Sequence, residues 1–232
     1  MTKTPIPEMS IGAIFDWDGV VIDSSEHHER SWEMLAEEVG KALPPDHFKH
    51  GFGQRNAVII PEILNWSQDP AEIERWSLRK EALYREIVAE RGLLALNGVR
   101  ELLDELNEAE IPCIVGTSTE RANVEMSLEL LSLHDQFSEM VCSEDVTRGK
   151  PDPEVFLKAA EKTGLPAARC FVIEDTAHGL EAALAGGMKA IGVATTRPAE
   201  HLAMAHWVAR DMTQVNLASI RSLFEDTPIT SR

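Results

Sequence analysis

The sequence lacks a long hydrophobic run. No apolar stretch approaches the roughly 20 residues that a helix needs to cross a bilayer. The N-terminal stretch also lacks the basic-then-apolar order of a secretory signal peptide. We therefore expect no contact with a membrane and a cytoplasmic location.

Basic residues are scarce as well. Lysine and arginine total 22 against 39 aspartates and glutamates, and the formal net charge is −17. Binding to nucleic acid depends on a basic surface, so this charge argues against a nucleic-acid partner. An anionic substrate would have to be attracted by a local lysine, arginine or metal ion, because the field of the whole protein repels it.

Several common binding motifs are missing. The three cysteines form no Cys-x-x-Cys pair and each lies within an apolar run, which predicts small buried side chains. No Gly-x-Gly-x-x-Gly is present to support a dinucleotide site. The stretch 148–150 is not part of a Walker A motif, because Pro151 follows the lysine and position 144 is not glycine.

What is present is a regular alternation of strands and helices. Apolar runs predict strands at residues 11–15, 111–116, 140–142, 170–173 and 190–193. Helical periodicity falls between and after them, at residues 99–110, 121–131, 154–163, 178–185 and 215–224. This alternation predicts an α/β fold, a doubly wound parallel sheet covered by helices on both sides.

One block interrupts the alternation. Residues 24–93 show helical patterns near 24–39, 56–65 and 70–90, with a flexible loop at Gly51–Gly53 and no strand. A helical block between the first strand and its expected partner predicts an inserted cap. We therefore assign residues 1–23 and 94–232 to a discontinuous core domain and residues 24–93 to a helical cap domain. The hinges of the cap are expected near Asp23 and near residues 94–97.

Polar residues follow four of the predicted strands. In chain order they are Asp16 and Asp18, Thr117 and Ser118, Lys150, and the pair Glu174–Asp175. An Asp-x-Asp-Gly sequence alone is more often the start of a solvated loop. The carboxyl ends of parallel strands, however, meet at one edge of a sheet, and ligands bind there. We therefore expect these side chains to converge on one site.

The residue types predict phosphoryl-transfer chemistry. A carboxylate such as Asp16 can attack phosphorus, and a second acid, Asp18, can protonate the leaving oxygen and later deprotonate water. Asp16, Asp175 and Glu174 are hard oxygen ligands suited to Mg²⁺, which neutralises charge that develops on a phosphate. A hydroxyl at Thr117 and a positive charge on a lysine would complete the phosphate site.

Four stretches resemble the motifs of the haloacid dehalogenase superfamily, in that family's order and spacing. They are FDWDGVVIDS at 15–24, VGTS at 115–118, RGKPDP at 148–153 and VIEDT at 172–176. The resemblance implies that Asp16 is the nucleophile and Asp18 the acid/base, whose backbone carbonyl would also bind the metal.

The same resemblance assigns the remaining motif residues. It implies that Thr117, with Ser118 beside it, binds the phosphate and that Lys150 orients nucleophile and phosphate. Glu174 and Asp175 would complete the magnesium site. Trp17 stands where the family has a smaller apolar residue, and we expect it to pack against the base of the cap.

A helical cap at this position matches the subgroup that includes β-phosphoglucomutase and phosphoglycolate phosphatase. A branch that acts on a riboflavin-pathway ribitylamino-uracil phosphate is also similar around residues 65–70 and 143–145. We therefore predict a magnesium-dependent phosphatase of a small phosphorylated metabolite, acting as a monomer or weak dimer. In the cap, Arg55 is expected to reach substrate phosphate or hydroxyls, since a guanidinium binds oxyanions in bidentate fashion.

Three alternatives are weighed against the phosphatase. A phosphomutase is favoured by His28, which resembles a histidine of the mutase cap helix, and disfavoured if the mutase's sugar-holding lysine aligns with Leu78. Arg79 or Lys80 could replace that lysine if the helix is in a different register. A dehalogenase needs no acid at the position of Asp18. A non-catalytic binding module would not need competent residues at every motif.

Overall fold

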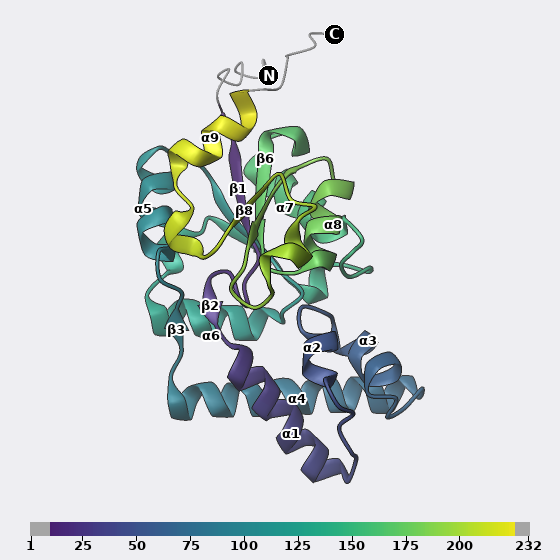
Figure 1. Ribbon diagram of the computed structural model, residues 1–232. Helices are drawn as coiled ribbons and strands as arrows, with labels where there is room; N and C mark the ends of the chain where they lie inside the picture. Colours follow the sequence, from purple (N-terminus) through teal and green to yellow (C-terminus); the bar gives the residue numbers. More distant parts are fainter. Residues whose placement is uncertain (1–9, 226–232) are drawn as a thin grey trace, which may run out of the picture.

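The computed structural model describes residues 10–225, and its centre is a six-stranded parallel sheet (Figure 1). The strand order is β5–β4–β1–β6–β7–β8, and every neighbouring pair is parallel. The strands are β1 (Gly12–Phe15), β4 (Cys113–Gly116), β5 (Glu139–Val141), β6 (Cys170–Glu174), β7 (Lys189–Val193) and β8 (Trp207–Ala209). This architecture confirms the predicted doubly wound α/β fold.

Side chains of the sheet pack on both of its faces. Along β1, Ala13 and Phe15 join one hydrophobic cluster, while Ile14 between them joins the cluster on the opposite face. The first cluster lies under α5 (Val99–Glu108), α6 (Arg121–Leu131) and α9 (Leu217–Glu225), and the second lies under α7 (Glu154–Thr163) and α8 (Ala177–Ala185). Burial on both faces explains why the strands have continuous apolar runs without polar alternation.

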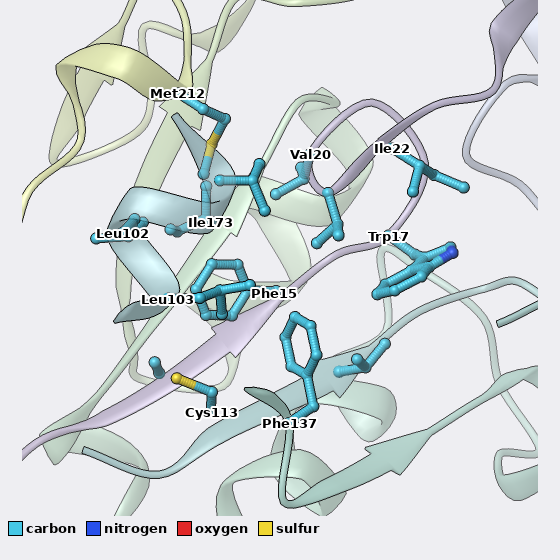
Figure 2. Close-up of a cluster of buried hydrophobic side chains, with 14 of the residues drawn as sticks. Phe15, Trp17, Val20, Ile22, Leu102, Leu103, Cys113, Phe137, Ile173 and Met212 are labelled. Carbon is cyan, nitrogen blue, oxygen red and sulfur yellow. The ribbon is translucent and has the colours of Figure 1, made fainter. Parts of the chain in front are cut away.

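Trp17 lies at the end of the first hydrophobic cluster. Its side chain is fully buried, and its ring meets that of Phe137 edge-on at 5.8 Å between centroids (Figure 2). Phe15 packs on the same phenylalanine ring at 5.5 Å. The cluster also contains Tyr84 and Val88, which belong to the helical block, so Trp17 lies in apolar packing that joins the two parts of the chain.

The block between the first two strands of the sheet is helical, as predicted. It comprises α1 (Ser25–Val39), α2 (His47–Gly51), α3 (Asn56–Val58), a π-helical turn (Ile59–Ile63) and α4 (Pro70–Arg91), here called the insert. Figure 1 shows the insert below the carboxyl edge of the sheet. It has a hydrophobic core of its own, built around the buried side chains of Trp32, Leu35, Trp66, Trp76 and Leu83.

A short antiparallel ladder closes the base of the insert. Strand β2 (Ile22–Asp23) leads into it and strand β3 (Leu94–Ala95) leads out, and the two pair through Ile22 with Ala95 and Asp23 with Leu94. The two connections expected to be hinges are therefore hydrogen-bonded to each other. Residues 1–9 and 226–232, which the sequence analysis placed in the core domain, lie outside the described residues.

Three local features differ from the sequence-based expectations. The helix expected at 56–65 is interrupted because Pro61 has no amide hydrogen, and Leu64 N instead donates to Ile59 O at 2.8 Å, five residues back. Gly51, expected in a flexible loop, ends the short helix α2 and is buried. Strands β2, β3 and β8 were not predicted. Within residues 10–225, no helix combines the length and apolarity needed to cross a membrane.

Candidate active site

The structure brings the predicted core residues together at the carboxyl edge of the sheet. Asp16 follows β1, Thr117 follows β4, and Glu174 ends β6 with Asp175 directly after it. Lys150 reaches the same place from the loop between β5 and α7. The side chains of all five are buried. The convergence arises because parallel neighbours end at one edge of the sheet.

Lys150 lies between two carboxylates. Its Nζ donates to Asp16 Oδ1 at 2.7 Å and to Glu174 Oε1 at 2.7 Å. Burial alone would lower the pKa of this lysine, but the two adjacent carboxylates outweigh burial and raise it. Burial raises the pKa of Asp16 to about 7, even though Lys150 acts in the opposite direction. Lys150 therefore stays charged and supplies a fixed positive charge beside Asp16.

Three carboxylates form a potential metal site. Asp16, Glu174 and Asp175 each offer an oxygen, and these oxygens lie within 4.8 Å of one another. Oδ2 of Asp175 accepts from Thr196, whereas its buried Oδ1 has no hydrogen-bond partner among residues 10–225. Burial and the neighbouring carboxylates raise the pKa of Asp175 well above its ordinary value. A hard divalent cation would satisfy the free oxygen and favour the ionised carboxylates, so the residues fit a metal such as Mg²⁺.

The three carboxylates are not equivalent. Oε2 of Glu174 already accepts from the backbone N–H of Thr176 at 2.7 Å and from its hydroxyl at 2.8 Å, while Oε1 accepts from Lys150. A Cβ atom at Gly179 would lie 1.7 Å from that Oε1, so only glycine gives the carboxylate room. Glu174 thus holds Lys150 in place while it lies beside Asp16 and Asp175, and its predicted role as a metal ligand stays a prediction.

Asp18 occupies a different environment from Asp16. Its Oδ1 accepts from Ser24 Oγ and contacts His28 Nε2 at 3.1 Å, and its Oδ2 accepts from Thr119 Oγ1. Burial would raise the pKa of Asp18, but the charge and hydrogen bond of His28, together with the two hydroxyls, hold it well below the usual range. The Asp18 side chain is not part of the group formed by Asp16, Glu174 and Asp175. That the backbone carbonyl of Asp18 binds the metal stays a prediction.

Sequence reasoning missed two of these partners. Ser24 and Thr119 each lie within or next to a recognised motif, but hydroxyl residues are too common in loops to be selected by type. Thr117 was predicted as a phosphate donor, and its Oγ1 accepts from Thr119 N at 3.2 Å. Thr117 and Ser118 both line the cavity above Asp16. The loop after β4 therefore contributes both to the cavity wall and to Asp18.

The insert contributes a row of contacting polar side chains, Glu81, Lys80 and His28, that ends at Asp18. Lys80 Nζ lies 2.6 Å from His28 Nδ1 and donates to Glu81 Oε1 at 3.0 Å. Glu81 also accepts from the side-chain amides of Asn56 at 2.7 Å and Asn123 at 2.6 Å. Because Asn123 lies on core helix α6 and Glu81 on α4, this carboxylate joins insert and core.

The contact between Lys80 and His28 corrects one argument made from the sequence. That argument aligned the sugar-holding lysine of the mutase with Leu78. The Leu78 side chain is 58% exposed, whereas Lys80 is 2% exposed and contacts His28. Lys80 is therefore the lysine placed beside His28, the histidine that contacts Asp18. The presence of a leucine at position 78 gives no reason to reject a phosphomutase.

A single cavity joins these groups. It has a volume of about 610 Å³, within the range of small-molecule sites. The core side of its wall includes Asp16, Asp18 and the loop 117–120, and the insert supplies His28, Lys80 and an apolar wall. That wall consists mainly of Trp32, Phe48, Phe52, Ile59, Ile73 and Leu78.

Arg55 also lines this cavity. Its Nη1 donates to the carbonyl of Thr147 at 3.2 Å and lies 3.5 Å from that of Val146. The guanidinium thus extends from the insert to the core loop that carries Lys150. Its contact with substrate stays a prediction.

Lys150 offers a test of this arrangement through stability. We expect Lys150→Met to lower the free energy of unfolding in EDTA by about 3–5 kcal/mol, because it leaves two buried carboxylates without their cation. The loss should be smaller at pH 5 than at pH 8, since protonation relieves the repulsion. Denaturant unfolding at both pH values measures it. The control Lys158→Met removes a surface pair whose lysine side chain is 41% exposed, and should cost about 0–1 kcal/mol. Equal losses in the two variants would contradict the assignment.

Comparison with known proteins identifies the family. Residues 13–193 match the family described as haloacid dehalogenase-like hydrolase. The chain therefore belongs to this family, as its four motifs predicted.

Among individual relatives, the chain is 34% identical over 223 residues to a chloroplastic 5-amino-6-(5-phospho-D-ribitylamino)uracil phosphatase of Arabidopsis thaliana. That match covers 95% of this chain but 59% of the relative, so the chain spans less than two thirds of the relative's length. It is 33% identical over 187 residues to hexitol phosphatase A of Escherichia coli, covering 78% of this chain and 82% of that protein. The crystal structure of a β-phosphoglucomutase from Clostridium difficile superposes with a TM-score of 0.83 at 25% identity, covering 92% of this chain and 96% of that one.

Proposed function

We propose that the chain is a magnesium-dependent phosphatase that cleaves a small organic phosphate monoester through an aspartyl-phosphate on Asp16. One observation carries the proposal. Two carboxylates, two positions apart in the sequence, face one cavity with separate partners. Asp16 contacts Lys150 and lies beside Glu174 and Asp175. Asp18 contacts His28 and the hydroxyls of Ser24 and Thr119. Separate environments of this kind allow two acids to take different chemical roles.

The side chains support a two-step reaction. In the first step an oxygen of Asp16 bonds to phosphorus, the bond to the alcohol oxygen breaks, and that oxygen takes a proton from Asp18. In the second step Asp18 takes a proton from water while the water oxygen bonds to phosphorus and the bond to Asp16 breaks. The products are the alcohol and inorganic phosphate. Asp18 must carry a proton in the first step, and the side chain of the insert that contacts its carboxyl group is His28, with Nε2 at 3.1 Å from Oδ1.

The remaining groups bind and orient the phosphate. Thr117 and Ser118 offer hydroxyl donors at the cavity wall, and Lys150 offers a charge fixed by Glu174. Asp16, Glu174 and Asp175 would hold Mg²⁺, with the Asp18 backbone carbonyl as a further ligand, and the ion would neutralise charge on the phosphoryl oxygens. Residues 24–93 would act as a cap that closes over the phosphate and excludes bulk water. A cytoplasmic location and a monomer or weak dimer stay predictions.

The substrate proposal follows the relatives and the cavity. The two curated relatives described above are named phosphatases, one of a hexitol and one of a ribitylamino-uracil. A cavity of about 610 Å³ is large enough for the phosphate monoester of a six-carbon polyol, or of a polyol chain that carries a ring. The phosphomutase remains the alternative, because Lys80 and His28 match its cap and one of the superposed structures is a β-phosphoglucomutase.

The deciding experiment separates hydrolysis from phosphoryl return. The protein is incubated with Mg²⁺, β-glucose 1-phosphate and a trace of glucose 1,6-bisphosphate, and inorganic phosphate and glucose 6-phosphate are followed together. Acetyl phosphate with and without Mg²⁺ serves as the general substrate. We expect Mg²⁺-dependent phosphate release from acetyl phosphate. Glucose 6-phosphate forming much faster than phosphate would replace the phosphatase by the mutase.

The metal site can be tested without turnover. We expect Mg²⁺ to raise the melting temperature of the native protein, because a ligand that binds only the folded state stabilises it. The Asp175→Ala variant should lose most of this shift, since it removes the buried oxygen that lacks a partner. Asp211→Ala, a change at a half-buried aspartate outside the acidic cluster, is the matched control and should keep the shift. A full shift in Asp175→Ala would remove Asp175 from the metal site.

A further inference from the structure

Most of the charged residues that line the cavity beyond Asp16 and Asp18 are acidic. Four glutamates, Glu74, Glu81, Glu120 and Glu144, line it together with two basic residues, Arg55 and Lys80. Lys80 is paired with Glu81 at 3.0 Å. The wall therefore carries more negative than positive charge on the side where the substrate's alcohol portion would lie.

Not all of these glutamates are free to act on a substrate. Glu81 is buried and accepts from Asn56, Asn123 and Lys80. Glu144 accepts from the backbone N–H of Arg121 at 3.0 Å and so satisfies the first turn of α6. Glu120 differs from both, because its nearest cation is Arg85 at 3.7 Å and its side chain is 24% exposed.

Glu120 lies next to the reacting groups. It directly follows Thr119, whose hydroxyl donates to Asp18, and it directly precedes α6. Burial raises its pKa to about 7, and Glu81 and Glu144 add to this effect against the opposing charges of Arg85 and Lys80. The local environment thus already disfavours a negative charge at this position. A second anion brought there by a substrate would meet the same environment.

The cavity is also lined by aromatic side chains. Trp32, Phe48 and Phe52 of the insert supply their rings. Phe48 and Phe52 lie against each other at 5.2 Å between ring centroids. Aromatic faces contact the neutral C–H surfaces of a polyol or a flat ring, and a carboxylate acceptor in the same cavity receives O–H or N–H donors.

We propose that Glu120 is a specificity-determining residue that excludes substrates with a second anionic group. The site would then select phosphate monoesters whose alcohol portion is neutral and ends in O–H or N–H donors. This inference rests on the proposed phosphatase activity and names the class of leaving group for the same site. It also disfavours a bisphosphate, which a phosphomutase must hold.

Two compounds of nearly equal size test the inference. Sorbitol 6-phosphate and 6-phosphogluconate differ at C1, where one has a CH₂OH group and the other a carboxylate. Each is used as a competitive inhibitor of Mg²⁺-dependent acetyl phosphate hydrolysis, so a Ki is obtained whether or not the compound is itself hydrolysed. In the native protein at about pH 8.5, where Glu120 is ionised because its pKa is about 7, we expect sorbitol 6-phosphate to bind at least about tenfold tighter, because like charges brought together at a binding site are strongly disfavoured.

Three variants test whether Glu120 causes the difference between the two Ki values. Glu120→Gln keeps the shape and removes the charge, so the Ki ratio should fall towards one, and Glu120→Lys should reverse it. Glu74→Gln removes an acid from the same wall that is exposed to solvent and therefore screened, so it should change the ratio far less than Glu120→Gln. Melting temperatures are recorded for all variants, because Glu120 also stands at the start of α6, where a negative charge favours the helix.

The outcomes are distinguishable. A native protein that does not hydrolyse acetyl phosphate with Mg²⁺ overturns the proposed function itself. Hydrolysis with a Ki ratio near one, or with a ratio that the Glu120 variants do not move, overturns the specificity inference alone. A lower melting temperature with an unchanged ratio assigns Glu120 to helix stability only. Failure of both compounds to inhibit also overturns the inference, because the cavity would then not take a polyol phosphate.

Discussion

We expect the Asp16→Asn variant to lose Mg²⁺-dependent phosphate release completely. An amide cannot attack phosphorus, so no aspartyl-phosphate forms and both steps of the proposed reaction stop. Asparagine has nearly the same shape as aspartate, and its Oδ1 can still accept from Lys150, which lies 2.7 Å from Asp16 in the native protein. The loss should therefore come from chemistry and not from unfolding.

Stability measurements make this distinction explicit. The pKa of Asp16 is raised from 3.8 to about 7 in the folded protein, mainly by burial. A raised carboxyl pKa means that ionised Asp16 opposes folding, and the cost grows as pH rises from the unfolded value towards the folded one. Asp16→Asn removes that cost, so at pH 8 in EDTA its melting temperature should not fall below that of the native protein.

Asp23→Asn is the matched control. It makes the same substitution at an exposed aspartate in β2, a few residues away, and should keep full activity. Steady-state phosphate release from acetyl phosphate measures both variants. More than a few per cent of native activity in Asp16→Asn, after contamination is excluded, would show that Asp16 is not the nucleophile.

The sequence predicts the core of the fold well, for a simple reason. Parallel strands buried on both faces must be apolar throughout, so β1 and β6 stand out as uninterrupted runs. The convergence of Asp16, Thr117 and Asp175 follows from the same geometry, because it depends on strand ends and not on the details of packing. Strand β8 escapes detection because it has three residues and two of them are only half-buried.

The insert is predicted less well, because helix positions depend on exact counting. At about 100° per residue, moving from Leu78 to Lys80 turns a side chain by roughly 200°, from a largely exposed position to a buried one beside His28. The sequence did contain a usable signal. Tyr84 lies four residues after Lys80, on the same face of α4. In the structure the His28 ring stacks on Tyr84 at 4.1 Å, beside Lys80.

Contacts between insert and core could not be predicted from residue types. The pairing of Glu81 with Asn123 joins positions 42 residues apart on helices α4 and α6. Neither residue belongs to a motif, and both types are common on helix surfaces. The hydroxyls of Ser24 and Thr119 around Asp18 are equally unremarkable by type. Only the folded arrangement shows that they face one carboxylate.

The second large effect is expected at Asp18. Asp18→Asn should slow turnover of an alkyl phosphate by roughly 10²–10⁴-fold, the usual loss when one general acid or base is removed. Asparagine still accepts hydrogen bonds through Oδ1, so the contacts from Ser24, Thr119 and His28 that position residue 18 are partly kept. The KM and the Ki for inorganic phosphate should therefore change far less than kcat.

Comparing two substrates shows which step Asp18 serves. Acetyl phosphate has a good leaving group that needs little protonation, so Asp16 should still be phosphorylated in Asp18→Asn. Release of phosphate from Asp16 needs a base to activate water, and without Asp18 the phosphorylated protein should accumulate and be detectable by mass spectrometry. Ser24→Ala removes one hydrogen bond to Asp18 but keeps its carboxylate, so it should reduce kcat less and accumulate no phosphorylated protein. Unchanged kcat in Asp18→Asn, or a loss equal to that of Ser24→Ala, would mean that Asp18 transfers no proton and that its low pKa reflects only its place between the insert and the core.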